Sequence, residues 1–190
     1  MGMKGYEEHK IDDLSLFTPG NCTPQFLEAS LVKRDLVDKL EKRLKESIKS
    51  KSKQSYLIIG PRGSGKSHIL AVLFNRIKKD RELQDRVVIA YLKEEERGIA
   101  TFLHWLVAIL NAFIRRNEDA RYLEEKLEEI RKIPSLKRIE SIAREMLIDY
   151  VGERTLLLIA ENLDDVFSEK KGMKKIGQQK FRDLIQEHPF

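Results

Sequence analysis

The sequence predicts an α/β fold in which helices flank a parallel sheet, and three observations support this prediction. Three short runs rich in aliphatic residues have the length and composition of buried strands. Amphipathic segments with helical spacing alternate with these runs along the chain. The first run leads through a glycine-rich turn directly into a helix, an order typical of parallel α/β sheets. The predicted strands cover Tyr56–Ile59, Val87–Leu92 and Thr155–Ala160.

The composition is that of a folded protein and excludes several classes. With 190 residues, of which 41% are hydrophobic and 35% charged, the chain can bury roughly 70% of its unfolded surface. No apolar run reaches the roughly 20 residues that span a bilayer, and the first residues do not resemble a signal peptide. The single cysteine, Cys22, excludes an internal disulfide framework. We therefore expect a cytoplasmic protein without membrane contact.

The part of the chain before the first strand is predicted to be an arm followed by two helices. Residues 1–17 are polar and mixed, so we expect a loosely held arm. Thr23 followed by Pro24 is a typical helix start, and it predicts a short helix through about Ala29. Apolar residues then recur at helical spacing over residues 31–48. They stand at positions 32, 36, 37, 40, 44 and 48.

The glycine-rich turn, residues 60–67, matches the phosphate-binding pattern G-x-x-x-x-G-K-[ST] at every fixed position. Gly63 and Gly65 can adopt backbone angles closed to other residues, so successive N–H groups can form an anion nest. Lys66 would reach the β- and γ-phosphates, and the Ser67 hydroxyl would ligate Mg²⁺. The candidate residues for binding nucleotide are Gly60, Pro61, Arg62, Gly63, Ser64, Gly65, Lys66, Ser67 and His68.

After the loop, a helix continues to about Ile77, and four further helices are predicted. Their apolar residues fall at helical spacing, and proline or glycine separates several of them from the next element. These helices cover residues 99–114, 121–132, 136–150 and 178–187.

The third predicted strand ends in a cluster of polar side chains. It is followed by Glu161, Asn162, Leu163, Asp164 and Asp165. Ligands of open α/β sheets bind at the carboxyl ends of the strands. A carboxylate there can hold the Mg²⁺ shell, and a neighbouring one can orient the attacking water. Paired with the glycine loop, this strand end predicts a Mg²⁺ site that includes Ser67, Glu161 and Asp164.

Three stretches resemble AAA+ and STAND-type P-loop ATPases, in particular the origin-recognition-like branch. Leu31–Leu40 resembles the "F-x-G-R-E-x-E-L" segment that opens such modules. Gly60–Leu70 resembles their "G-P-R-G-S-G-K-S-H-L" loop, the Walker A motif, and Leu156–Phe167 resembles their "hhhh-D-E-L-D" strand end, the Walker B motif. The resemblance implies ATP and Mg²⁺ as cofactors and a nucleotide-binding core over residues 30–190, preceded by an arm and short helix over residues 1–29.

The strand end departs from the pattern of this family. Against "D-E-L-D" the chain has Glu161, Asn162, Leu163 and Asp164, so an asparagine replaces the residue that positions the lytic water. Asn can hydrogen-bond a water but cannot accept its proton. A second register makes Glu161 the water-orienting residue and leaves Ala160 in place of the Mg²⁺ acid. In either register one acid is missing unless Asp164 or Asp165 substitutes, so we expect slow hydrolysis that depends on Lys66, Glu161 and Asn162.

The resemblance also implies a sensor strand, an arginine finger and a helical lid after the Walker B strand. Only one helix is predicted beyond residue 167. In this family the sensor strand lies in the sheet between the P-loop strand and the Walker B strand. A sheet without that central strand would leave buried backbone N–H and C=O groups unpaired. We therefore expect an N-terminal part of a longer ATPase; otherwise a partner chain or an unusual strand order must close the sheet.

These observations favour an ATP-binding module that acts as a nucleotide-dependent switch or assembly motor. A small-molecule P-loop kinase is an alternative, because such kinases carry the same loop. A scaffold that binds nucleotide and scarcely hydrolyses it is another, and Asn162 supports it. We expect ATP and ADP, protein partners or self-assembly as interactions. The net charge of +5 permits DNA contact but argues for it only weakly.

Overall fold

The computed structural model describes residues 22–32, 34–50, 54–93, 100–161, 163 and 173–187. The chain divides into two compact units. The first unit comprises Met1–Ser50 and Gln54–Leu83, and the second comprises Lys51–Lys53 and Gln84–Phe190. The predicted arm over residues 1–17 lies outside the described residues. Among the described helices, none is both long and apolar enough to cross a membrane.

The described residues of the first unit form the α-helices α2 (Pro24–Ala29), α3 (Arg34–Ser50) and α4 (Lys66–Lys79). The predicted start of α2 is confirmed, because the Phe26 N–H donates to the Thr23 hydroxyl oxygen at 3.3 Å. Helix α3 begins three residues later than predicted. Val32 lies in the bend before it and is 92% exposed, so this residue was wrongly assigned to the apolar stripe.

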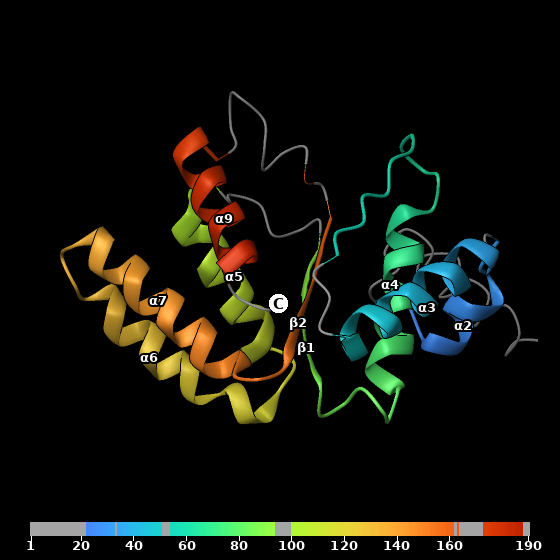
Figure 1. Cartoon of the computed structure of the whole chain (residues 1–190), viewed down its shortest axis with the longest axis horizontal. Helices are drawn as coiled ribbons and strands as arrows, with labels where there is room; N and C mark the ends of the chain where they lie inside the picture. Colours follow the sequence, from blue (N-terminus) through green and yellow to red (C-terminus); the bar gives the residue numbers. More distant parts are fainter. Residues whose placement is uncertain are drawn as a thin grey trace, which may run out of the picture. The chain divides into compact units, whose positions relative to one another are not determined.

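Apolar side chains from all three helices form the core of the first unit. Figure 1 shows α2 and α3 beside α4, and both helices contact it. The stripe of α3 contributes through Val37 and Leu40, which are buried as predicted. The buried residues of this core are Leu27, Leu31, Val37, Leu40, Ile69, Ala71, Val72 and Leu73.

The predicted strand over Tyr56–Ile59 is not formed. Tyr56 and Ile58 pack against the core of the first unit, but Leu57 and Ile59 alternate with them and are 71% and 84% exposed. An extended segment becomes a strand only when a neighbouring strand pairs with its N–H and C=O groups. The described residues of the first unit include no such strand. The prediction of a strand buried on both faces was therefore wrong.

The second unit contains the two predicted strands with the predicted bounds, β1 (Val87–Leu92) and β2 (Thr155–Ala160). They pair in parallel, with Val87 opposite Thr155 and Leu92 opposite Ala160. Within the described residues these two strands make up the sheet. The helices between them form the crossover that parallel strands require. The α/β class and the parallel sheet flanked by helices are thus confirmed.

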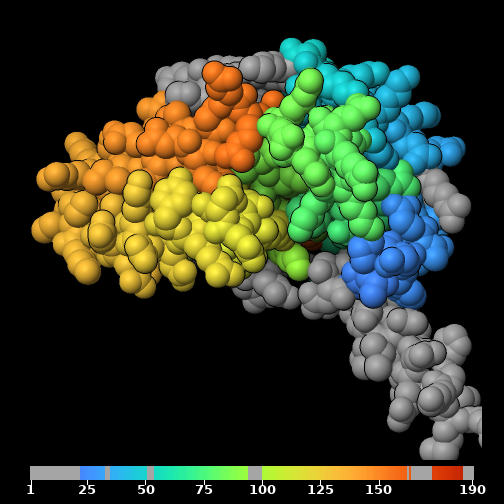
Figure 2. Space-filling view, turned by 90° about the horizontal axis from the view of Figure 1, so that it is seen from below, coloured from blue at the N-terminus to red at the C-terminus, as the bar shows by residue number. Residues whose placement is uncertain are grey.

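The crossover is longer than one helix, and a last helix follows β2. The elements are α5 (Phe102–Ile114), the 3₁₀ turn η2 (Glu118–Ala120), α6 (Tyr122–Arg131), α7 (Leu136–Val151) and α9 (Lys175–Glu187). Figure 1 shows α5, α6 and α7 on the same side of the two strands. In Figure 2, α6 (yellow) and α7 (orange) lie side by side, and their residues are in contact. Most of these bounds lie within a few residues of the prediction.

Helix α5 is the centre of the core of the second unit. It packs on β1, α7 and α9. Its buried side chains include Leu106, Ile109 and Leu110, each at most 1% exposed, as the helical spacing predicts. The last helix starts three residues earlier than predicted. Gly177 sits in its first turn, where a Cβ would lie 2.5 Å from the Met173 side chain. Glycine therefore permits a close approach here rather than ending the helix.

Candidate nucleotide-binding site

The glycine loop of the first unit has the backbone geometry that an anion nest requires. Gly63 and Gly65 have φ angles of 79° and 83°, in the left-handed region that favours glycine. The Ser64 N–H donates to the Pro61 carbonyl at 3.2 Å, which closes the turn. Pro61, Arg62, Gly63 and Gly65 are exposed to solvent. The loop is thus held by its own backbone hydrogen bond and is accessible to solvent at these residues.

The loop leads directly into the N-terminus of α4. Gly65 is the N-cap residue, and no side chain caps this end of the helix. The first N–H groups of a helix have no acceptor within the helix, and the helix dipole places positive charge there. A phosphate at this end would therefore be bound by backbone N–H groups. Ser67 is the second residue of α4, and its side chain is half-buried.

Lys66 folds back onto its own loop. Its ammonium group donates to the Gly60 carbonyl at 2.7 Å and to the Pro61 carbonyl at 2.9 Å. The loop is also narrow at Gly60, where a Cβ would lie 2.7 Å from the Ser64 hydroxyl oxygen. An ammonium group has three donors. Lys66 can therefore contact a phosphate while it remains bonded to the loop.

His68 joins the first turn of α4 to α2. Its Nε2 lies 2.7 Å from the Leu27 carbonyl oxygen. Because a carbonyl oxygen only accepts, Nε2 carries the proton and donates. The sequence analysis placed His68 in the nucleotide-binding set; the structure gives it a contact that fixes α2 beside the loop.

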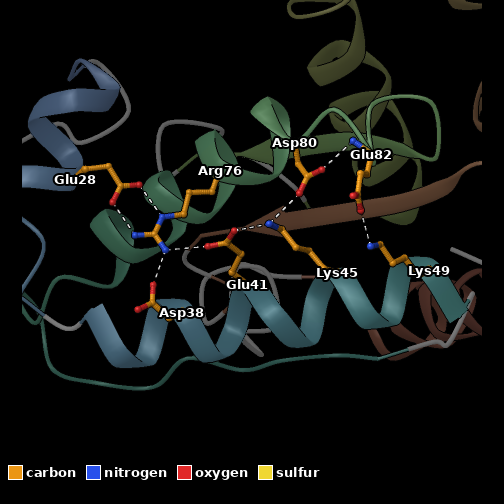
Figure 3. A network of polar contacts seen from close by, with 8 residues as sticks. All are labelled: Glu28, Asp38, Glu41, Lys45, Lys49, Arg76, Asp80 and Glu82. Carbon is orange, nitrogen blue, oxygen red and sulfur yellow. Dashed lines mark hydrogen bonds and ion pairs between the residues drawn. The ribbon is translucent and has the colours of Figure 1, made fainter.

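A network of ion pairs holds α4 in place within the first unit (Figure 3). Arg76 donates two hydrogen bonds to Glu28 at 2.6 and 2.7 Å, and it also pairs with Asp38 and Glu41. The Glu28 hydrogen bonds are the main reason that the pKa of Arg76 lies above its usual value. The network links all three helices of the unit, so it fixes the helix that carries the loop.

Three further ion pairs lie along α3 (Figure 3). Lys45 pairs with Glu41 at 2.7 Å and with Asp80, just after α4, at 2.8 Å. The hydrogen bond from Lys45 lowers the pKa of Asp80, and the same bond raises the pKa of Lys45. Lys49 and Glu82 form an exposed pair at 2.6 Å. None of these pairs was predicted from the sequence. Lys45 and Glu41 are one helical turn apart, but the partners Asp80 and Glu82 are far from α3 along the chain.

The candidate Mg²⁺ acid lies in the second unit, at the carboxyl end of β2. The Glu161 N–H donates to the Leu92 carbonyl at 3.0 Å, so the pairing with β1 continues one residue beyond the strand. One carboxylate oxygen of Glu161 accepts a hydrogen bond from the Tyr91 hydroxyl at 2.5 Å. Asn162, Asp164 and Asp165, which the sequence analysis also singled out, lie outside the described residues.

The sequence analysis missed Tyr91, which it treated only as a strand residue. Tyr91 is 2% exposed, and the Arg116 guanidinium lies 5.1 Å from the centre of its ring. Burial is the main cause that raises the pKa of Tyr91, and the hydrogen bond to Glu161 raises it further. The signal available in the sequence was only that Tyr91 stands near the carboxyl end of a predicted strand; the pairing of that strand with Thr155–Ala160 came from the structure.

The loop residues of the first unit suit the phosphates of a nucleotide, and each unit has a side chain that suits Mg²⁺. Two left-handed glycines, an uncapped helix N-terminus and Lys66 suit phosphates. Mg²⁺ in nucleotide sites is bound by few protein groups together with phosphates and water, so a single hydroxyl such as that of Ser67, or a single carboxylate such as that of Glu161, has the chemistry of a protein ligand for it. In the described part of the chain, no group of three or more His, Cys, Asp or Glu side chains could hold a metal by itself.

The fold and the loop geometry together define a P-loop nucleotide-binding protein. Comparison with protein families narrows this class to one family: the family model described as AAA ATPase domain matches residues 31–187. The chain therefore belongs to the AAA ATPase domain family. Neither curated proteins nor solved structures include a match.

Proposed function

We propose that the chain is an ATP-binding AAA+/STAND-type module of the origin-recognition-like branch, in which the bound nucleotide controls assembly or a protein partner. The observation that carries this proposal is the loop with left-handed Gly63 and Gly65 that opens into the uncapped N-terminus of α4. The family match favours an ATPase over a small-molecule kinase. We further propose a cytoplasmic location and a nucleotide-binding core that begins near residue 30.

The residues of the loop bind and orient the triphosphate. Backbone N–H groups around Gly63 and Gly65 contact phosphate oxygens, and Lys66 adds a positive charge at the β- and γ-phosphates. The candidate protein ligands of Mg²⁺ are the Ser67 hydroxyl in the first unit and the Glu161 carboxylate in the second; a bound Mg²⁺ would supply positive charge for the phosphates. These roles need the backbone of the loop to be fixed before nucleotide arrives, and the ion pairs of Arg76 stabilise the helix that carries it.

Slow hydrolysis follows from the polar residues after β2. Asn162 can hydrogen-bond a water but cannot take its proton, so the nucleophile is oriented without a general base. Glu161 takes the Mg²⁺ role in this register. In the second register Glu161 orients the water, and Asp164 or Asp165 supplies the acid for Mg²⁺. Slow turnover suits a protein whose nucleotide state persists as a signal.

Binding and turnover of ATP, measured on four proteins, test this proposal. We expect Lys66→Ala to abolish ATP binding, because the loop loses its charge. Lys79→Ala is the matched control: this exposed lysine lies in the last turn of the same helix, and its loss should leave binding unchanged. Asn162→Glu should raise turnover about 10²-fold or more, the usual contribution of a positioned base.

Two results would contradict parts of the proposal. If wild-type protein binds no ATP, the proposal of an ATP-dependent module is wrong. If wild-type turnover is fast and Asn162→Glu leaves it unchanged, Glu161 or a downstream aspartate activates the water, and slow hydrolysis is wrong. DNA binding is the weakest of the proposed interactions. A steep dependence of duplex binding on salt concentration would support it.

A further inference from the structure

Glu161 is held by β1 through both its backbone and its side chain. The backbone bond joins the Glu161 N–H to the Leu92 carbonyl at 3.0 Å, and the side-chain bond comes from the Tyr91 hydroxyl at 2.5 Å. The two residues of the side-chain bond are 70 positions apart in the chain. The parallel register, with Tyr91 opposite Ile159 and Leu92 opposite Ala160, places them at the same end of the sheet.

The direction of this hydrogen bond is fixed by the chemistry of its two groups. An ionised carboxylate only accepts, so the Tyr91 O–H donates. A phenol ordinarily has a pKa of about 10, so the Tyr91 hydroxyl carries the proton that it donates at neutral pH. A carboxylate has about four acceptor sites, and the bond from Tyr91 uses one of them. Glu161 can accept from Tyr91 and bind a cation at the same time.

The Tyr91 ring itself is firmly positioned. It is 2% exposed on strand β1, and the Arg116 guanidinium lies over it at 5.1 Å from the ring centre. The packed ring presents its hydroxyl to the carboxylate from a fixed position. In contrast, the glutamate side chain has three rotatable bonds and follows the last residue of a strand. The hydrogen bond from Tyr91 therefore restricts the orientation of the carboxylate.

We propose that Tyr91 is the positioning residue for Mg²⁺ binding at Glu161: its hydroxyl holds the carboxylate in place for the metal. This inference rests on the proposed function, since it takes Glu161 as the Mg²⁺ acid. Hydrogen-bond partners of metal ligands matter almost as much as the ligands, and their loss typically lowers metal affinity or activity about 10–100-fold.

The test is the Tyr91→Phe variant of the full chain, which removes one oxygen and keeps the ring under Arg116. Binding of a non-hydrolysable ATP analogue is measured by calorimetry, first with EDTA and then across a Mg²⁺ titration. We expect the half-saturating Mg²⁺ concentration to rise about tenfold or more, while the affinity in EDTA stays that of wild type. The metal dependence separates positioning from a loss of fold, which would weaken both.

Tyr150 provides a closely matched control in the same unit. It is 5% exposed, its hydroxyl donates to Asp119 at 3.2 Å, and the Arg154 guanidinium lies 5.1 Å from its ring centre. Tyr150→Phe thus removes the same kind of hydrogen bond from a similar environment, without touching Glu161. It should change thermal stability about as much as Tyr91→Phe and leave the Mg²⁺ dependence unchanged.

A double-mutant cycle with Glu161→Gln completes the test. If Tyr91 acts through Glu161, Glu161→Gln alone raises the half-saturating Mg²⁺ concentration. Adding Tyr91→Phe to Glu161→Gln then raises that concentration by less than a further twofold. If Tyr91→Phe shifts the Mg²⁺ midpoint no more than Tyr150→Phe does, the positioning role is refuted while the ATPase proposal stands. If wild type binds no nucleotide, both proposals are overturned.

Discussion

Replacement of Arg76 tests whether the ion-pair network stabilises the first unit. Arg76→Met removes the guanidinium and keeps most of the apolar stem. The two hydrogen bonds to Glu28 come from a guanidinium that is 22% exposed, and hydrogen bonds to charged groups contribute about 1.5–3 kcal/mol. Asp38 is 61% exposed, so that pair contributes less than about 1 kcal/mol. Glu41 still pairs with Lys45 at 2.7 Å in the variant, so breaking the Arg76–Glu41 pair costs little additional stability.

We therefore expect Arg76→Met to lower the free energy of unfolding by about 3 kcal/mol. For a chain of this size such a loss lowers Tm by roughly 6–12 °C. Urea and thermal denaturation followed by circular dichroism measure both quantities. Much of the loss arises from carboxylates left without a partner, so adding Glu28→Gln to Arg76→Met should restore part of the stability.

Two comparisons decide whether the reasoning is right. Lys49→Met removes a pair at 2.6 Å whose side chains are 50% and 73% exposed, and we expect a loss of less than about 1 kcal/mol. Arg76→Lys keeps the charge but not the bidentate hydrogen bonds to Glu28. Its loss of unfolding free energy should therefore lie between those of Arg76→Met and Lys49→Met. If Arg76→Met destabilises the protein no more than Lys49→Met, the network does not hold α4 in place.

Two further predictions concern pH and the loop backbone. Lys45 lowers the pKa of Asp80, so this pair stabilises the fold at pH values above the usual carboxyl range, and its contribution is lost as the pH falls through the lowered pKa. The free energy of unfolding, measured by urea denaturation, should therefore differ less between neutral pH and a pH below about 4 in Asp80→Asn than in wild type. Gly65→Ala should cost about 1–2 kcal/mol of stability because its φ is 83°, and it should weaken ATP binding. Gly152→Ala, at a φ of 58°, should destabilise the protein and leave ATP binding unchanged; equal ATP affinity in both variants would refute the role of the loop.

Much of the fold could be predicted because its signals are local. The aliphatic runs of β1 and β2 and the helical spacing of α5 each depend on residues a few positions apart. Thr23 before Pro24 correctly predicted the start of α2. The main error concerns residues 56–59, because an apolar run shows that a segment can form a strand, not that a neighbouring strand is available to pair with it.

The candidate site was predictable to the same extent. The pattern from Gly60 to Ser67 predicted a phosphate loop, and the φ angles of Gly63 and Gly65 are compatible with that prediction. The composition of a strand end also indicated Glu161 as an acid for Mg²⁺. Its partner Tyr91 was not predictable from the strand pattern, because a tyrosine in an apolar run looks the same whether its hydroxyl has a partner or not.

The sequence alone determined the class of protein, the position of the loop and the family to which the chain belongs. Only the tertiary structure decided which charges meet. Arg76 reaches Glu28 across 48 positions, and Tyr91 reaches Glu161 across 70. A motif is encoded by neighbouring residues because backbone geometry sets the distances between them. Contacts at long separation depend on the path of the whole chain, so the residues that hold α4 and orient Glu161 became visible only once that path was known.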